Sequence, residues 1–152
     1  MLTHSQARSI AEAVWGTGGT HSTRTNRNGA FYFSCSSHGG FVIDARCLAH
    51  DEYARIRRYV DPEQAEDYGK AVNHPYRRRS FKVTHAQLCN REDFEFFLLE
   101  EDCDWCLAPL MADIRTLDGR MTNEDAQRTF DQWIAPRALT ATFSTRTADL
   151  SA

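Results

Sequence analysis

Two short motifs contain most of the side chains in this chain that could perform chemistry. The first combines one imidazole with two glycines and reads Ser37-His38-Gly39-Gly40. The second gathers three consecutive carboxylates, a thiol, a fourth carboxylate and an indole, in the order Glu100-Glu101-Asp102-Cys103-Asp104-Trp105. Apolar runs flank both motifs, so we expect each motif to be held against a hydrophobic core.

A divalent cation is the first ligand that these side chains could hold. His38 could supply an imidazole nitrogen, while Glu100, Glu101 and Asp102 could supply carboxylate oxygens. Hard oxygen ligands with one imidazole suit Mg²⁺ or Mn²⁺. Consecutive helical residues point in different directions, so at most two of the three carboxylates could bind one ion. The pattern predicts a small metal-assisted hydrolase or transferase, and a solvated helix start that complements the helix dipole is the structural alternative.

Cys103 is a candidate nucleophile, with His38 as its base. A helix N-terminus would lower the pKa of this thiol, but the neighbouring carboxylates would raise it, because they disfavour a further negative charge. The local charges therefore argue against a reactive thiolate. We commit to no catalytic residue, and His38, Glu101, Asp102 and Cys103 form the catalytic set of the enzyme hypothesis only.

Two Cys–His pairs have a spacing that suits zinc. Two residues separate Cys35 from His38, and two separate Cys47 from His50; four such ligands could close a tetrahedral site. However, Cys35 falls within an apolar strand pattern and Cys47 falls where a helix begins, and free cysteines often simply pack in the core. We expect no cofactor, and the zinc site stays an alternative.

A basic turn that interleaves arginine with aromatic residues is the candidate partner-binding segment. Its side chains of interest are Tyr76, Arg77, Arg78, Arg79 and Lys82. Arginine beside aromatic rings can bind phosphates and stack on bases, and arginine and tyrosine are frequent hot-spot residues at protein interfaces. The segment predicts contact with a protein surface or, less directly, with single-stranded nucleic acid, and a solvated charged turn is the structural alternative.

The elements that must position these side chains can be predicted from hydrophobic spacing. Residues 30–35 and 40–44 predict two strands of a hairpin, with glycine in the turn between them. Thr3 is expected to cap a first helix that Gly16 ends, and the Gly-rich residues 16–29 predict a loop.

Further elements are predicted in the second half of the chain. A helix is expected from Asp51, and Asp61-Pro62 begins another. Residues 92–112 predict a strand to about Leu99 and then a helix opened by residues 100–102. A last helix begins with a cap at Thr122 and ends before Pro136. Its apolar stripe is predicted to comprise Ala126, Phe130, Trp133 and Ile134.

Length, charge and cysteine content limit the classes of protein. The 152 residues with a hydrophobic fraction of 41% predict one folded domain at residues 1–139 and a tail at 140–152, either an edge strand or disordered. A net charge of −3 excludes a strongly basic nucleic-acid binder. The odd number of cysteines, five, and the lack of a leader or membrane-spanning pattern predict a reduced, cytoplasmic protein.

The two motifs resemble those of a small family of unknown function that is common on plasmids, prophages and phages. The similar segments are residues 33–41 and 100–105, preceded by Trp15-Gly16, and the resemblance spans roughly residues 14–111. The arginine-rich turn departs from the family pattern. The resemblance implies a mobile-element protein, and proteins of this origin often inhibit host defence, as anti-CRISPR proteins do by occupying a surface of their target.

These observations lead to one expected fold, a leading function, one alternative and, as a third option, a single-strand nucleic-acid binder that acts through the basic turn at residues 76–82. The fold class is α+β, with a small antiparallel sheet around the residue 30–44 hairpin and four or five covering helices. The leading hypothesis is an interaction protein whose partner is a host protein or ribonucleoprotein complex. The alternative is the metal-assisted enzyme that uses His38 and residues 100–102.

Overall fold

The structure, a computed structural model, describes residues 1–36, 38–60, 86–91 and 94–137. Its helices and strands follow in the order α1 (His4–Trp15), β1 (His21–Thr23), β2 (Ala30–Ser34), β3 (Gly39–Asp44), α2 (His50–Arg57), β4 (Gln87–Arg91), β5 (Phe94–Glu100), α5 (Leu107–Ala112) and α6 (Asn123–Thr129). Short 3₁₀ turns lie at Ala45–Cys47 and Asp104–Cys106, and a π-helical turn lies at Phe130–Ile134. Helical residues 135–137 follow this turn, so the last helix does not end before Pro136 as predicted.

The strands form one five-stranded antiparallel sheet in the order β1-β2-β3-β5-β4. β2 and β3 make the predicted hairpin, in which Ala30 pairs with Ile43 and Ser34 pairs with Gly39. The central strand β3 also pairs with β5, so two segments far apart in the sequence lie side by side. The predicted α+β class, with a small antiparallel sheet around this hairpin, is confirmed.

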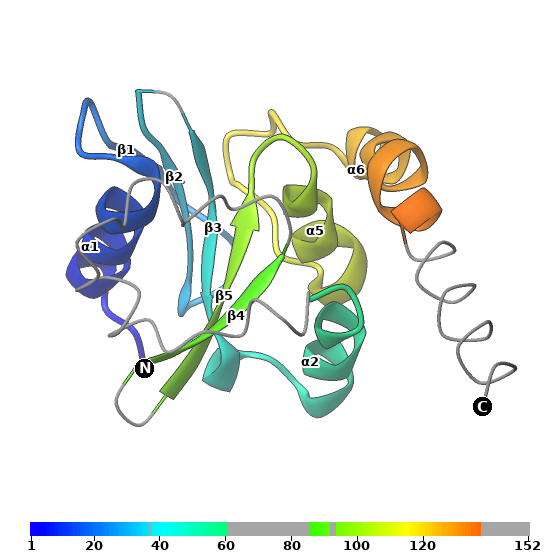
Figure 1. Ribbon diagram of the computed structural model, residues 1–152, viewed down its shortest axis with the longest axis horizontal. Coiled ribbons are helices and arrows are strands. Elements are labelled where there is room, and N and C mark those ends of the chain that lie inside the picture. Colours follow the sequence, from blue (N-terminus) through cyan, green and yellow to red (C-terminus); the bar gives the residue numbers. More distant parts are fainter. Residues whose placement is uncertain (37, 61–85, 92–93, 138–152) are drawn as a thin grey trace, which may run out of the picture.

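Helices cover both faces of the sheet (Figure 1). One hydrophobic cluster joins α1 to Phe33, Val42, Phe96 and Leu98, while a second cluster joins α2, α5 and α6 to the other face. Because successive side chains of a strand point to opposite faces, one strand supplies residues to both clusters. This explains why β5 is a nearly continuous apolar run rather than an alternating one.

Helix caps form where the sequence predicts them. The hydroxyl of Thr3 accepts a hydrogen bond from the backbone N–H of Gln6, and Gly16 ends α1 with a φ of 107°. Thr122 likewise accepts a hydrogen bond from the N–H of Asp125 at the start of α6. Each cap satisfies a backbone donor that the first helical turn leaves without a partner.

Several predicted elements are corrected. Residues 16–29 are not only a loop, because His21–Thr23 pairs with β2 as an edge strand. β4 was not predicted, since its sequence QLCNR shows little hydrophobic pattern. Trp133 was predicted to lie in the apolar stripe of the last helix but is 53% exposed. The π-helical turn at Phe130–Ile134 changes the spacing that this prediction assumed.

Two ion pairs, one with a fully buried carboxylate and one partly buried, hold the connecting segments against the sheet. The carboxylate of Asp44, at the end of β3, accepts hydrogen bonds from the backbone N–H of Leu2 and from the backbone and guanidinium of Arg46. Arg27 makes a two-pronged pair with Glu52 of α2 at 2.9 and 3.0 Å and also donates to the carbonyl of Ala112.

Some predictions concern parts of the chain outside the described residues. They are the helix that begins at Asp61, the basic turn at residues 76–82 and the tail at residues 140–152. Among the helices that the structure describes, none is both long and apolar enough to cross a membrane.

Candidate functional site

The pairing of β3 with β5 brings the two sequence motifs together. Gly40 lies opposite Glu100 in the ladder, and the backbone N–H of Glu101 donates to the carbonyl of Gly39 over 2.9 Å. The hairpin turn is closed by the N–H of Cys35, which donates to the carbonyl of His38 over 2.7 Å. His38 therefore stands in the turn directly beside the end of β5.

The side chains that meet at this point are His38, Glu100 and Glu101. Each side chain offers one atom that could bind a metal ion, and these three ligand atoms lie within 4.8 Å of one another. Nδ1 of His38 lies 3.5 Å from Oε1 of Glu100. In the part of the chain that the structure describes, this is the only group of three or more His, Cys, Asp or Glu side chains arranged to hold a metal ion.

Glu100 is the unusual member, because its carboxylate is buried. The residue is 5% exposed, and its Oε2 accepts a hydrogen bond from the N–H of Asp102 over 2.8 Å. Its Oε1 is also buried and accepts no hydrogen bond from any described residue. Burial has the largest effect and raises the pKa of Glu100, and the charges of Asp102 and Glu101 act in the same direction. The hydrogen bond from the N–H of Asp102 and the nearby His38 oppose this shift. A buried acceptor without a donor costs about 1–3 kcal/mol.

Glu101 is half-buried beside the same space. Burial raises its pKa, and the charge of Asp102 acts in the same direction. The nearby side chain of Tyr32, from β2, acts in the opposite direction and lowers the pKa. A Cβ at residue 39 would come within 2.8 Å of Glu101 Oε2 and would also collide with the backbone of β2, so glycine is required there.

The geometry is close to that of a cation site. Donor atoms that share one ion at bonds of about 2.1 Å lie about 3 to 4 Å apart. The three donor atoms here need to approach by only about 1 Å to meet this condition. The side chain of His38 is 56% exposed and can make such a shift without repacking the core.

The other members of the proposed catalytic set take different places. Asp102 is exposed and contributes its backbone N–H rather than a carboxylate to the cluster. Cys103 is half-buried, and burial together with the charge of Asp104 raises the pKa of its thiol to about 11. A thiol with this pKa is protonated at neutral pH, in agreement with the expected effect of the carboxylates.

Residues 100–102 do not open a helix. Glu100 is the last residue of β5, and the next helical residues belong to the 3₁₀ turn Asp104–Cys106. The carboxylates therefore do not complement a helix dipole here. The sequence-based alternative, a solvated helix start, is wrong, because these residues lie at the end of a strand.

The four residues of the alternative zinc site are not brought together. Cys35 and His38 lie at one end of β3, whereas Cys47 and His50 follow its other end. A strand of six residues separates these positions by about 20 Å. Burial raises the pKa of Cys47 to about 11. The partner-binding residues Tyr76 to Arg79 and Lys82 lie outside the described part of the chain.

Tyr32 is the functional candidate that sequence reasoning missed. Its position in the apolar run of residues 30–34 is typical of a core residue, and it is only 7% exposed. Its relation to Glu101 depends on the antiparallel order β2-β3-β5. No signal within the sequence indicates that order.

Comparison with known proteins adds no further information. No protein family, curated protein or solved structure matches this chain. The resemblance to a family of mobile elements thus stays a prediction, and the function must be argued from the cluster itself.

Proposed function

We propose that this protein binds a divalent cation through His38, Glu100 and Glu101 and acts as a small metal-assisted hydrolase or transferase. The observation that supports the proposal is the buried carboxylate of Glu100, whose Oε1 has no hydrogen-bond donor among the described residues and faces His38. Core positions rarely keep such an acceptor without a reason. A bound cation would supply the missing partner and would offset the cost of burial.

The number of ligands favours catalysis over a purely structural role. Structural zinc sites use four protein ligands, whereas catalytic sites keep a position open for water or substrate. Three protein ligands leave such positions free, and the exposed side of His38 gives solvent access to them. A cation held in this way lowers the pKa of a bound water toward neutrality, which provides the nucleophile for hydrolysis.

The donor set also limits the choice of ion. One imidazole with two carboxylates suits Mn²⁺ or Zn²⁺, while Ca²⁺ prefers a set made of oxygen atoms only. The carboxyl groups must be deprotonated to bind, so affinity is expected to rise with pH. The raised pKa values of Glu100 and Glu101 extend this pH dependence above the ordinary range of glutamate.

The first experiment measures cation binding. Titration of the metal-free protein with Mn²⁺ and with Zn²⁺, followed by calorimetry, should give one site per chain. Removal of a ligand in Glu100→Gln or His38→Ala should weaken binding at least about 100-fold. Glu124→Gln is the matched control, because Glu124 is an exposed glutamate in the first turn of α6. Absence of binding, or equal binding by all variants, contradicts the proposal.

The second experiment separates an enzyme from a metal-stabilised binder. Nitrophenyl esters of phosphate and of carboxylic acids are incubated with the protein loaded with Mn²⁺ or Zn²⁺. Hydrolysis that requires the metal, is lost in Glu100→Gln and persists in Glu124→Gln supports the catalytic role. Metal binding with no turnover of any ester would leave the cation as a structural element and would disprove the enzymatic part of the proposal.

The hypothesis of an interaction protein stays a prediction that does not involve the His38 cluster. It rests on the resemblance and on the basic turn at residues 76–82, and the described residues supply no contact that favours it. Reversal of the three arginine charges should weaken capture of a host protein or ribonucleoprotein complex if that turn is the contact surface.

A further inference from the structure

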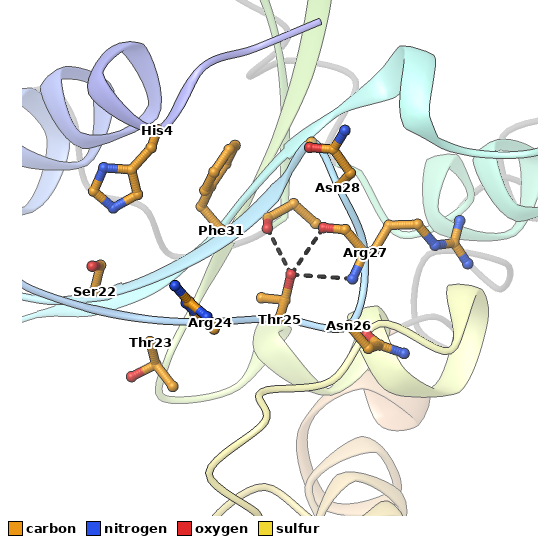
Figure 2. A pocket seen from close by; sticks show the side chains of 11 residues that line it. His4, Ser22, Thr23, Arg24, Thr25, Asn26, Arg27, Asn28 and Phe31 are labelled. Atoms are coloured by element: carbon orange, nitrogen blue, oxygen red, sulfur yellow. Dashed lines mark hydrogen bonds between the residues drawn. The ribbon is translucent and has the colours of Figure 1, made fainter.

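A second candidate site lies on the α1 face of the sheet, away from the His38 cluster. It is a pocket of about 530 Å³ between the start of α1, strand β1 and the segment that leads into β2. Figure 2 shows its side chains, with His4 and Phe31 on one side and the residues from Ser22 to Asn28 along the strand and loop. Ligand sites for small molecules usually enclose about 300–1,000 Å³, so the size is suitable.

The charge of the lining favours an anion. None of the residues that line the pocket is acidic, and two of them are arginines. Arg27 is already neutralised by its pair with Glu52, and its guanidinium points away from His4 and Phe31 (Figure 2). Arg24 is exposed, and none of the ion pairs among the described residues includes it. One guanidinium is therefore available to a ligand.

Aromatic rings form the opposite side of the pocket. His4 and Phe31 contact each other edge to face, with ring centroids 5.8 Å apart. The ring of Phe31 is only partly buried, and His4 is exposed. Planar groups pack favourably on such rings. A ligand that combines a planar ring with a negative group would use both sides of the pocket at once.

The loop that carries Arg24 is held in place before any ligand binds. The side chain of Asn26 donates to the carbonyl of Asp113 and accepts from the N–H of Arg115, over 2.8 and 2.7 Å. The carbonyl of Arg24 itself accepts from the N–H of Leu117 over 2.8 Å. Figure 2 also shows Thr25, whose hydroxyl lies 2.7 Å from the carbonyl of Ala30. Such preorganisation lowers the entropic cost of binding.

From these observations we infer that the pocket binds a small organic anion with a planar ring, of the class of the nucleoside monophosphates. Arg24 would contact the phosphate, and the rings of His4 and Phe31 would pack against the base. The amide of Asn28, which also lines the pocket, could reach the edge of the base. This site does not depend on the cation proposed at His38.

The test uses AMP as the probe, with ribose 5-phosphate and adenosine as its two halves. Titration calorimetry in the presence of a chelator prevents a cation at the His38 cluster from binding the phosphate. We expect AMP to bind at least tenfold more tightly than either half. If ribose 5-phosphate or adenosine alone bound as tightly as AMP, the pocket would not need both the phosphate and the base. Either result would overturn the proposal.

Two variants assign the binding to the pocket. Arg24→Gln should weaken AMP at least tenfold, because it removes the cation without changing the backbone contacts of the loop. Arg58→Gln is the matched control, since Arg58 is an exposed arginine at the end of α2, and should bind as the wild type does. Phe31→Leu should weaken AMP and adenosine but not ribose 5-phosphate. No binding of AMP, or equal binding by Arg24→Gln, contradicts the site.

Discussion

In Glu100, the stability of the metal-free fold favours a protonated carboxyl group, whereas the proposed cation binding requires a deprotonated one. Its carboxylate is buried, and its pKa is raised chiefly by that burial. The folded protein therefore holds a proton on Glu100 at pH values where the unfolded chain, with an ordinary value of 4.5, has released it. By linkage, the contribution of this group to stability is fully present below the unfolded pKa and is lost as pH rises through the folded pKa.

The first prediction is that Glu100→Gln does not destabilise the metal-free protein at neutral pH. Glutamine fits the same space without a charge, so the stability of the variant relative to the wild type should rise as pH rises above 4.5, the ordinary pKa of glutamate. Urea unfolding at several pH values, with chelator present, measures this difference. If Glu100→Gln instead lost the same stability at every pH, the prediction would be wrong. The wild-type carboxylate would then make stabilising contacts that a glutamine cannot make.

The sequence was sufficient to propose His38 and the carboxylate run but not to choose among them. Residue types indicate which atoms can bind a cation, whereas strand register decides which of them meet. Because Gly40 pairs with Glu100, the side chains of Glu100 and Glu101 reach His38, while Asp102 contributes only its backbone. A shift of one residue would reverse the faces of β5.

At the scale of elements, Asp44 links the first residues of the chain to the end of β3. The carboxylate is fully buried and accepts hydrogen bonds from Leu2 and Arg46. Burial alone would raise its pKa, but these hydrogen bonds outweigh burial and lower the pKa below its ordinary value of 3.8. Its stabilising contribution is therefore present above the unfolded pKa and is lost as pH falls through the folded pKa.

The second prediction follows from this link. Asp44→Asn should destabilise the protein by about 2–3 kcal/mol at pH 7, because charged hydrogen bonds are replaced by neutral ones. The difference from the wild type should shrink as pH falls below 3.8 and through the lower pKa of the folded state, where the wild-type carboxylate takes up a proton. Asp118→Asn is the control, because Asp118 pairs with Arg120 at the same sequence spacing but at a more exposed position. If both variants lost the same stability, the burial of Asp44 would not be the reason for the effect.

Elements with a strong apolar pattern were predicted, and those formed mainly by backbone pairing were not. The β2–β3 hairpin and β5 are rich in aromatic and branched side chains, which the pleated surface accommodates well. β1 consists of His21, Ser22 and Thr23 and forms because the edge of β2 offers free backbone groups. In β4, Leu88 and Cys89 join opposite clusters, so neither face shows an apolar stripe in the sequence.

At the scale of the whole molecule, the two hydrophobic clusters share one sheet. Phe97 and Leu99 belong to the cluster under α2, α5 and α6, while Phe96 and Leu98, their neighbours in β5, belong to the cluster under α1. Loss of packing on either face releases the strand that the other face needs. The described layers should therefore unfold together, even though helices on the two sides do not share a cluster.

The third prediction tests this coupling with a deletion on the α1 face. Ile10 is fully buried, so Ile10→Ala should cost about 2–5 kcal/mol through lost contacts and the cavity left behind. The variant should still unfold in a single calorimetric transition at a lower Tm, with equal calorimetric and van't Hoff enthalpies. Leu107→Ala removes a buried side chain from the opposite cluster and should behave in the same way. Two separate transitions in either variant would show that α1 is an independent layer, because its loss would then leave the sheet and the opposite helices folded.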